Sequence, residues 1–381
     1  MSGQGMSDAA LRLVVGGVEA RRIAIIGAGF YGCHIAATLM ALGFEVTIFE
    51  RSEGLLTQAS GANQFRLHLG FHYARCHSTR MQSRDGFRRF VSHYPEMTAA
   101  VDENIYAVSR SESLVDYETY KMIMTGSAIP FEEIETASVP ITGVSGMMLA
   151  GERVLLVDQA RAHFDALVRD RVTFSHAVSS IAEHDDRVEI DGQTFDYAID
   201  CTWGHLTRPA VPVFYEPTLM LYYETEGTFP AVTMVDGPLY SVYPTQDRKI
   251  FTLSSVTETP LGQFDDAAAA LAYRDSLTGA DIAAKQQAME RQIHKYLPDF
   301  GERFRYAGPQ LSLKTKLTGL SDSRTCSVSG EGRLLSVVSG KIDAVFFAME
   351  RVLELIGVPH SRAMAAVRPQ PGQDRAAAGG L

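Results

Sequence analysis

The order of apolar and polar residues between positions 21 and 51 predicts a strand, a helix and a second strand. Residues 23–26 form a short, continuously apolar run, which is typical of a strand buried on both faces. Residues 30–43 have the length of a helix and end at a glycine, and residues 45–50 are again largely apolar. The folded chain is therefore expected to begin with a βαβ unit.

Three glycines occupy the turn between the predicted first strand and the helix. Gly27, Gly29 and Gly32 have the spacing that allows a tight turn, the close approach of a pyrophosphate and close packing of helix on strand. Glu50 ends the second strand 18 positions after Gly32, where a carboxylate can accept hydrogen bonds from ribose hydroxyls. The unit predicts a dinucleotide site, and because no second glycine triplet follows, one such site is expected.

A strict alternation starts at residue 65. Its apolar positions are Phe65, Leu67, Leu69, Phe71 and Tyr73, and the residues between them are Arg66, His68, Gly70 and His72. The alternation predicts a strand over 65–73 with one apolar and one cationic face. From 54 to 84 the chain has no Asp or Glu but four arginines and three histidines. A solvated helix face and an anion site both stay open for Arg75, Arg80 and Arg84.

The middle of the chain predicts a second structural unit. Residues 104–127 and 218–259 are rich in β-branched and aromatic residues, which favours an antiparallel sheet. Residues 264–297 have helical periodicity, and 305–328 form a return strand. Residues 152–204 predict a helix, a strand, a hairpin turned at Asp191 and Gly192, and a buried strand. Residues 333–357 predict a strand, a glycine turn and a helix that begins near Gly340 and offers free N–H groups to an anion.

Composition and charge exclude several classes of protein. The chain has 381 residues, 46% hydrophobic and 21% charged, which is enough for two structural domains. A net charge of −10 argues against general binding to nucleic acid or anionic membranes. No apolar stretch approaches the roughly 18 residues of a membrane span. The four cysteines are scattered and have no metal-ligand spacing, so free thiols and a cytoplasmic location are expected.

These motifs together resemble a known family. The glycine triplet, the acid after the second strand, the strand end at 200–204 and the C-terminal glycine turn are similar to those of FAD-dependent oxidoreductases of the glycine oxidase and D-amino-acid oxidase type. The resemblance covers residues 21–357. It implies an α/β fold with a Rossmann-like, glutathione-reductase-type FAD-binding domain and a second α+β substrate domain built on an antiparallel sheet.

The resemblance also implies how the chain is divided. The FAD-binding domain would be discontinuous, and the substrate domain would be inserted into it. The expected segments are 21–100, 150–210 and 325–360 for FAD and 101–149 and 211–324 for substrate. Composition, not the resemblance, predicts a flexible leader at 1–20 and a disordered, Pro-, Gly- and Ala-rich tail at 361–381.

By the same resemblance, a set of residues is expected around the FAD. They are Gly27, Gly29, Phe30, Tyr31, Gly32, Glu50, Arg51, Ser60, Gly61, Asn63, Gln64, Val178, Thr202, Trp203, Gly204, Gly340, Lys341, Ile342 and Asp343. Non-covalent binding is expected, and a covalent bond through His68 is the alternative. A metal site is not expected, because residues four apart on a strand lie about 13 Å from each other.

A second set is expected to act on the substrate. Its members are Arg66, His68, His72, Tyr243, Lys314 and Lys341. Arg66 and His68 follow directly after the loop expected to meet the flavin, so a functional role is favoured for both. The substrate-binding arginine of the family has no recognisable counterpart, and Lys314, Lys316 and Arg324 are the alternatives. Tyr222, Tyr223 and Tyr240 are further candidate hydroxyl donors.

The expected activity is oxidation of a C–N bond in a small anionic amine or amino acid. A hydride would pass to flavin N5, water would hydrolyse the imine, and molecular oxygen or an electron carrier would take the electrons. Oxidation of a C–OH bond, as in 2-hydroxy acids, and hydroxylation by a flavin monooxygenase are the alternative activities. A dinucleotide-binding protein without turnover is the remaining class.

Overall fold

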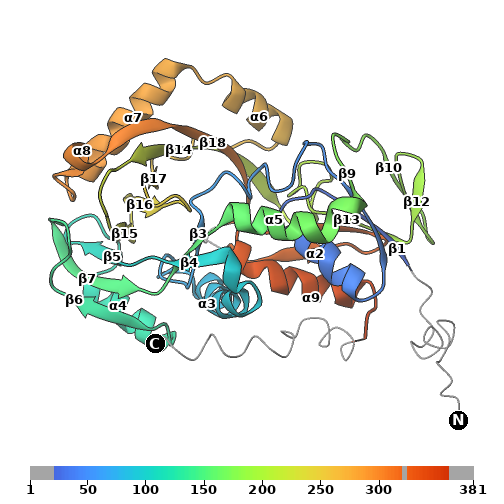
Figure 1. Ribbon diagram of the computed structural model, residues 1–381, viewed down its shortest axis with the longest axis horizontal. Coiled ribbons are helices and arrows are strands. Elements are labelled where there is room, and N and C mark those ends of the chain that lie inside the picture. The colour runs from blue at the N-terminus through green and yellow to red at the C-terminus, as the bar shows by residue number, and fades with distance from the viewer. Residues whose placement is uncertain (1–20, 320–323, 360–381) are drawn as a thin grey trace, which may run out of the picture.

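The computed structural model describes residues 21–319 and 324–359. The expected leader at 1–20 and the expected tail at 361–381 lie outside the described residues. Figure 1 shows two parts side by side: a sheet covered by helices, and a larger curved sheet with helices arching over it. Within the described ranges, no helix is long and apolar enough to cross a membrane.

A six-stranded sheet carries the predicted βαβ unit. In spatial order its strands are β19 (Ser327–Ser329), β20 (Leu334–Val338), β13 (Tyr197–Asp200), β1 (Arg22–Ile26), β2 (Glu45–Phe49) and β9 (Val172–Thr173). All its strand pairs are parallel except β19 with β20. The strand order differs from the chain order, so segments far apart in sequence lie side by side here.

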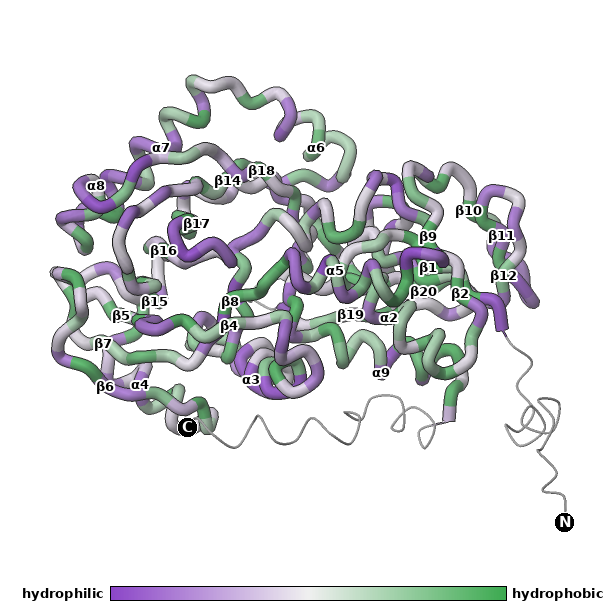
Figure 2. Tube along the Cα trace, viewed as in Figure 1, coloured by the Kyte–Doolittle hydropathy of each residue, from purple (hydrophilic) through white to green (hydrophobic). Residues whose placement is uncertain are grey.

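Both faces of this sheet are buried, as the continuously apolar run at its centre predicts. Ile23 and Ile25 pack into one core with helices α2 (Phe30–Ala41), α5 (Val157–Val168) and α9 (Val345–Leu355). Ala24 and Ile26 pack on the other face against strands β10 (Ile181–Glu183), β11 (Val188–Ile190) and β12 (Gln193–Phe195). Figure 2 shows the apolar character of β1 and α2 beside the more hydrophilic α3 (His77–His93).

The second part is an eight-stranded mixed sheet. In spatial order its strands are β18 (Arg305–Leu317), β14 (Val213–Glu224), β17 (Ile250–Ser255), β16 (Tyr240–Pro244), β15 (Ala231–Val235), β5 (Asn104–Ser109), β7 (Val144–Ala150) and β6 (Phe131–Ile134). The antiparallel expectation fails at one pair, because β5 and β15 run parallel. Helices α6 (Ala267–Asp275), α7 (Gly279–His294) and α8 (Phe300–Arg303) arch over β14 and β18 (Figure 1).

A three-stranded sheet links the two parts. It consists of β3 (Arg66–Leu67), β8 (Arg153–Leu155) and β4 (Thr98–Ala100), with β8 in the middle. The remaining short elements are the 3₁₀ turns η1 (Pro95–Met97), η2 (Arg169–Arg171) and η3 (Ile342–Ala344). The α/β fold class expected from the sequence is confirmed.

The predicted strand over 65–73 is wrong in most of its length. Only Arg66 and Leu67 form a strand, and the chain then turns, with Gly70 at a φ of +117°. A side chain at Gly70 would approach the backbone oxygen of Arg80 to 3.0 Å. The alternation of residue types therefore reflects which side chains are buried in this bent segment, and it does not indicate a continuous strand.

Two further element predictions need correction. Residues 117–126 were expected in a sheet but form helix α4 (Tyr117–Gly126), which begins where the Asp116 side chain accepts a hydrogen bond from Thr119 N over 2.8 Å. The C-terminal helix α9 begins at Val345 rather than near Gly340, because the 3₁₀ turn η3 precedes it.

Candidate active site

A cavity of about 880 Å³ lies between the six-stranded and eight-stranded sheets. Its lining includes most of the residues expected around FAD. Those residues are Gly27, Gly29, Phe30, Tyr31, Glu50, Arg51, Ser60, Asn63, Gln64, Val178, Thr202, Trp203, Gly340, Lys341 and Ile342. Arg66, His68, His72 and Lys314 from the second expected set line the same cavity.

The glycine turn at the start of α2 leaves backbone open to the cavity. Gly27 has a φ of +98°, and a Cβ there would lie 3.2 Å from Cys201 O. A Cβ at Gly29 would have Ser60 Oγ, at 3.3 Å, as its nearest neighbour. Gly29 is the N-cap of α2, and Phe30 N donates to Ser60 Oγ over 3.0 Å. The N-terminus of a twelve-residue helix thus borders the cavity, as a pyrophosphate site requires.

Glu50 is held in place at the end of β2. Its carboxylate accepts hydrogen bonds from Ala28 N over 2.6 Å and from Ser52 N over 2.8 Å. Glu50 is 6% exposed and lines the cavity beside Gly27. An acid that is fixed here by backbone donors can accept the ribose hydroxyls of an adenosine.

Trp203 lines the cavity between the central strand β13 and the C-terminal glycine turn. Its Nε1 is buried and has no hydrogen-bond partner among the described residues. A Cβ on Gly340 would lie 3.6 Å from Trp203 Cζ2, so the indole and the glycine turn are neighbours. A buried unpaired donor in a ligand cavity fits a bound group with acceptor atoms.

The loop from Ser60 to Gln64 borders the cavity, and hydrogen bonds of its side chains hold it in place. Asn63 Oδ1 accepts from Phe65 N over 2.5 Å, and Gln64 Nε2 donates to Ser254 Oγ over 3.0 Å. Glycine turn, helix terminus, fixed acid and polar loop together provide the groups that an FAD needs. The residues present therefore fit FAD.

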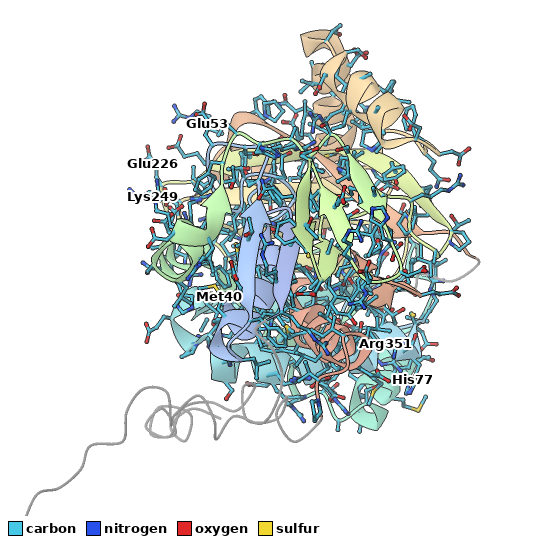
Figure 3. The ribbon with its side chains drawn as sticks, turned by 90° about the vertical axis from the view of Figure 1, so that its right-hand side faces the viewer. Met40, Glu53, His77, Glu226, Lys249 and Arg351 are labelled. Carbon is cyan, nitrogen blue, oxygen red and sulfur yellow. The ribbon has the colours of Figure 1, made fainter. Side chains whose placement is uncertain are left out.

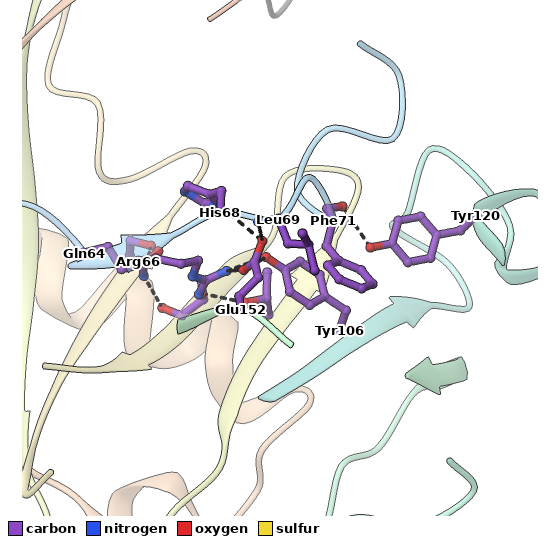
Figure 4. Close-up of polar contacts among 11 residues, drawn as sticks. Gln64, Arg66, His68, Leu69, Phe71, Tyr106, Tyr120 and Glu152 are labelled. Carbon is purple, nitrogen blue, oxygen red and sulfur yellow. Dashed lines mark hydrogen bonds and ion pairs between the residues drawn. The ribbon is translucent and has the colours of Figure 1, made fainter. Parts of the chain in front are cut away.

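Arg66 lies in a buried polar network beside this loop (Figure 4). Its Nη1 donates to Tyr106 Oη over 2.8 Å, its Nη2 donates to Ser241 Oγ over 2.5 Å, and its guanidinium lies 3.9 Å from the ring centroid of Tyr243. Glu152 Oε2 is 3.8 Å from Nη1. The side chains of Arg66 and Glu152 are both 0% exposed, so the cationic face expected from the sequence has a buried counter-charge here.

His68 and His72 come together because the segment bends after Leu67. Their ring centroids are 5.7 Å apart, so the separation of about 13 Å that a strand would impose does not hold. Even so, no group of three His, Cys, Asp or Glu in the described parts of the chain is placed to hold a metal. Burial, followed by Lys341 and Arg66, holds the pKa of His68 well below its usual range. His68 is therefore a neutral imidazole at pH 7.

Lys341, which is buried, and Lys314, which is half-buried, supply positive charge to the cavity. Burial lowers the pKa of Lys314 to about 8 and that of Lys341 to about 8. Lys341 Nζ has no hydrogen-bond partner among the described residues and lies 4.0 Å from the ring centroid of Tyr73. The two alternatives to Lys314, which are Lys316 and Arg324, also line the cavity, and Lys316 pairs with Glu216. Charged side chains such as Glu53, Glu226 and Lys249 lie at the periphery instead (Figure 3).

Five expected residues lie outside the cavity lining. They are Gly32, Gly61, Gly204, Tyr243 and Asp343. Gly32 permits packing, because a Cβ there would lie 1.9 Å from Gly27 O, and a Cβ at Gly61 would lie 2.4 Å from Leu56 O. Tyr243 lies under Arg66. The Asp343 carboxylate is buried, and its backbone packs against Gly86 of α3.

Of the other candidate tyrosines, one lines the cavity and two do not. Tyr240 lines the cavity, Tyr222 Oη accepts a hydrogen bond from Gln310 Nε2, and Tyr223 packs in the core under α7, where it donates to Glu290 over 2.7 Å. Sequence reasoning missed Glu152, Tyr106 and Ser241. A single acid inside the apolar stretch 147–157 was the one local signal for Glu152.

Comparison with protein families gives a direct match. The family described as "FAD dependent oxidoreductase", DAO, matches residues 22–311, which is most of the chain. The chain belongs to the DAO family of FAD-dependent oxidoreductases. It is therefore an enzyme that uses FAD.

Two relatives are similar to this chain over most of its length. The FAD-dependent monooxygenase FPY4 of Fusarium mangiferae is 57% identical over 341 residues, covering 90% of this chain and 92% of the relative. The FAD-dependent monooxygenase kojA of Aspergillus flavus is 28% identical, covering 88% of this chain and 85% of the relative.

Solved structures share the fold. Glycine oxidase from Geobacillus kaustophilus has a TM-score of 0.65 at 12% identity, covering 88% of this chain and 94% of that chain. L-α-glycerophosphate oxidase from Mycoplasma pneumoniae, solved with FAD bound, has a TM-score of 0.69 at 14% identity, covering 89% and 94%. At such low identity these likenesses establish the fold alone.

Proposed function

We propose that this enzyme oxidises a carbon that bears a hydroxyl group on a small anionic substrate. The observation that carries the proposal is the juxtaposition of a neutral histidine, His68, with two lysines, Lys314 and Lys341, in the cavity that fits FAD. Bound FAD supplies the hydride acceptor for such chemistry. The protein has to hold the anion, orient the reacting C–H bond and take up the proton.

The lysines are the groups that we assign to the anion. Glu216 lies opposite Lys314 in the strand pair and favours its charged form, and Lys341 Nζ has no hydrogen-bond partner among the described residues. Arg66 is less suited to this role, because Tyr106, Ser241 and Glu152 already surround its guanidinium. An ammonium group that burial has partly desolvated gains more from an anionic ligand than a solvated one does.

We assign His68 as the acceptor of the substrate's hydroxyl proton. This role decides which bond of the substrate we propose to be oxidised. A hydroxyl group must lose its proton as the hydride leaves, whereas a neutral amine can lose a hydride without a base. A neutral imidazole that faces the cavity can accept that proton. The geometry therefore favours a C–OH bond over the C–N bond that the sequence suggested first.

A substrate screen under anaerobic conditions tests the proposal. The purified protein should be yellow, and a 2-hydroxy acid or a related anionic alcohol should bleach the flavin absorbance. Amines and amino acids are tested in parallel, and bleaching by those compounds alone would favour oxidation of a C–N bond instead. A protein that takes up no FAD would contradict both activities. Readmitted oxygen, or an added electron carrier, then shows which of them accepts the electrons.

A monooxygenase is the second candidate, because the relative at 57% identity is described as one. Hydroxylation consumes NADPH or NADH together with oxygen. Rapid mixing with each nicotinamide under anaerobic conditions separates the candidates: bleaching that depends on nicotinamide supports hydroxylation, and bleaching by substrate alone supports the oxidase or dehydrogenase.

Two finer properties complete the proposal. We expect FAD to be held without a covalent bond, so acid precipitation should leave the yellow colour in the supernatant; colour in the pellet would support attachment through His68. In the described parts of the chain Cys33, Cys76, Cys201 and Cys326 form no disulfide, which supports a reducing compartment such as the cytoplasm.

A further inference from the structure

Glu152 is a buried carboxylate at the edge of the candidate active site. It precedes β8 in the chain, and the residue is 1% exposed. Its Oε1 accepts a hydrogen bond from Leu69 N over 2.8 Å, and its Oε2 accepts one from Tyr106 Oη over 2.7 Å (Figure 4). Burial raises the pKa of Tyr106 well above its usual range, so this phenol keeps the proton that it donates.

The same carboxylate is within reach of the imidazole of His68. Glu152 Oε1 lies 3.6 Å from His68 Nδ1, just beyond hydrogen-bond length (Figure 4). His68 Nδ1 is buried and has no hydrogen-bond partner among the described residues, whereas the side chain keeps 20% of its surface exposed. Polar groups in ligand-free active sites are often separated by slightly more than a hydrogen bond and come closer when the substrate binds.

Glu152 also fixes the backbone that carries this histidine. Leu69 N, its hydrogen-bond donor, belongs to the residue directly after His68. The Arg66 guanidinium, two residues before His68, lies 3.8 Å from Glu152 Oε2. One carboxylate therefore holds the segment on both sides of His68.

We propose that Glu152 is a positioning residue for His68. Glu152 accepts the Nδ1 proton and thereby leaves Nε2 unprotonated toward the cavity, where it can take the hydroxyl proton of the substrate. A carboxylate behind a histidine selects one tautomer and stabilises the imidazolium that forms after proton transfer. This inference rests on the proposed function, because it supports the role of His68 as proton acceptor.

Several charged and titratable groups face His68 and set the sign of the expected pH effects. Lys341, Arg66 and Lys314 oppose protonation, and His72 and Tyr73 lie with ring centroids 5.7 Å from the imidazole. Asp343 and Glu216 offset part of the charge of Lys341 and Lys314, and Glu152 is the carboxylate that lies 3.6 Å from His68 Nδ1. Loss of its charge should therefore lower the pKa of His68 further and make the imidazole a weaker base.

The test is Glu152→Gln, which keeps the size of the side chain and removes the charge. Nitrogen NMR of ring-labelled histidine reports the tautomer and the pKa of His68 in the resting holoenzyme, and a His68→Gln sample assigns the signal. We expect the parent enzyme to carry the proton on Nδ1. In Glu152→Gln we expect a shift of the tautomer population and a lower pKa of His68. An unchanged tautomer and pKa would overturn the proposal.

Glu216→Gln is the matched control, because Glu216 is a buried carboxylate that lines the cavity and pairs with Lys316 instead. It should leave the tautomer and the pKa of His68 as in the parent. If Glu152→Gln fails to fold, the double variant Arg66→Met, Glu152→Gln removes both buried charges together. The tautomer of His68 should change in that variant too, and a parental tautomer there would count against the proposal.

Turnover provides the second readout once a substrate is known. Glu152→Gln should lower kcat about 10- to 100-fold and change KM little, since the anion-binding lysines are untouched. A rise in KM at constant kcat would overturn the positioning role. The NMR result needs no substrate. A correct tautomer shift in an enzyme that oxidises no alcohol would therefore leave the positioning role standing and refute the proposed function.

Discussion

The two sides of the cavity are built in different ways. The central part of the side that fits FAD is backbone and glycine, and its turn, helix and acid come from residues 22–50. The side that carries Arg66 consists of side chains from distant elements: Ser241 is 175 positions away and Glu152 is 86 positions away. A backbone site can therefore be recognised locally, whereas the charge balance of a side-chain site depends on partners that only folding supplies.

The largest expected effect is on folding and FAD binding, and it differs between two glycines on the side of the cavity that fits FAD. Gly32→Ala should prevent folding with bound FAD, because its Cβ would lie 1.9 Å from Gly27 O and the helix cannot approach the strand. Gly29→Ala should fold normally, since its Cβ would lie 3.3 Å from Ser60 Oγ, but should hold FAD poorly because the methyl group blocks the approach of the pyrophosphate. Flavin absorbance per protein and thermal melting of the apoprotein measure the difference. Equal FAD retention in Gly29→Ala and the parent would contradict the assignment.

The next effect concerns the buried charges of the other side. Arg66→Ala leaves Glu152 buried without its cation, so we expect a loss of about 3–5 kcal/mol in the free energy of unfolding. Arg305→Ala is the control, because Arg305 pairs with Glu224 at the surface, where an ion pair contributes at most about 1 kcal/mol. Urea denaturation compares the two variants. Similar stabilities of both variants would show that Glu152 needs no counter-charge.

A third effect tests the anion site without unfolding the protein. Lys314→Met should raise KM for the anionic substrate about 10-fold or more with a smaller change in kcat. The pKa of Lys314 near 8 means that the ammonium loses its charge as the pH rises from 7 to 9, so KM should rise over that range in the parent. The rise should be weaker in Lys314→Met. Lys285→Met, which breaks a pair with Glu258 outside the cavity, should behave like the parent.

The smallest expected effect is on stability, and it concerns an ion pair at the edge of the cavity. Arg75 Nε donates to Asp236 Oδ2 over 2.6 Å, and Arg75 is about half exposed. Asp236→Asn should therefore change the free energy of unfolding by less than about 1 kcal/mol. Thermal melting at low and high salt measures it. A loss comparable to that of Arg66→Ala would mean that the cationic residues of 66–84 form one cooperative network.

The segment 65–73 shows where prediction from the sequence stopped. Its alternation identified Arg66 and His68 as unusual, but it also predicted a straight strand, whereas the chain turns at Gly70 and brings His68 to His72. Helix α4 was missed for a related reason. Its β-branched and aromatic residues favour strands on average, but Asp116 caps a helix and the surrounding fold accepts one.

The sequence by itself determined the βαβ unit, the glycine turn and Glu50, because these depend on backbone conformation and on spacing along fewer than thirty residues. It also determined the α/β class and the family. Only the tertiary structure decided that Arg66 is buried beside Glu152, that His68 is neutral, and that Lys314 and Lys341 share one cavity. The physical reason is that burial and neighbouring charges set the state of an ionisable group, and both arise from contacts between residues far apart in the chain.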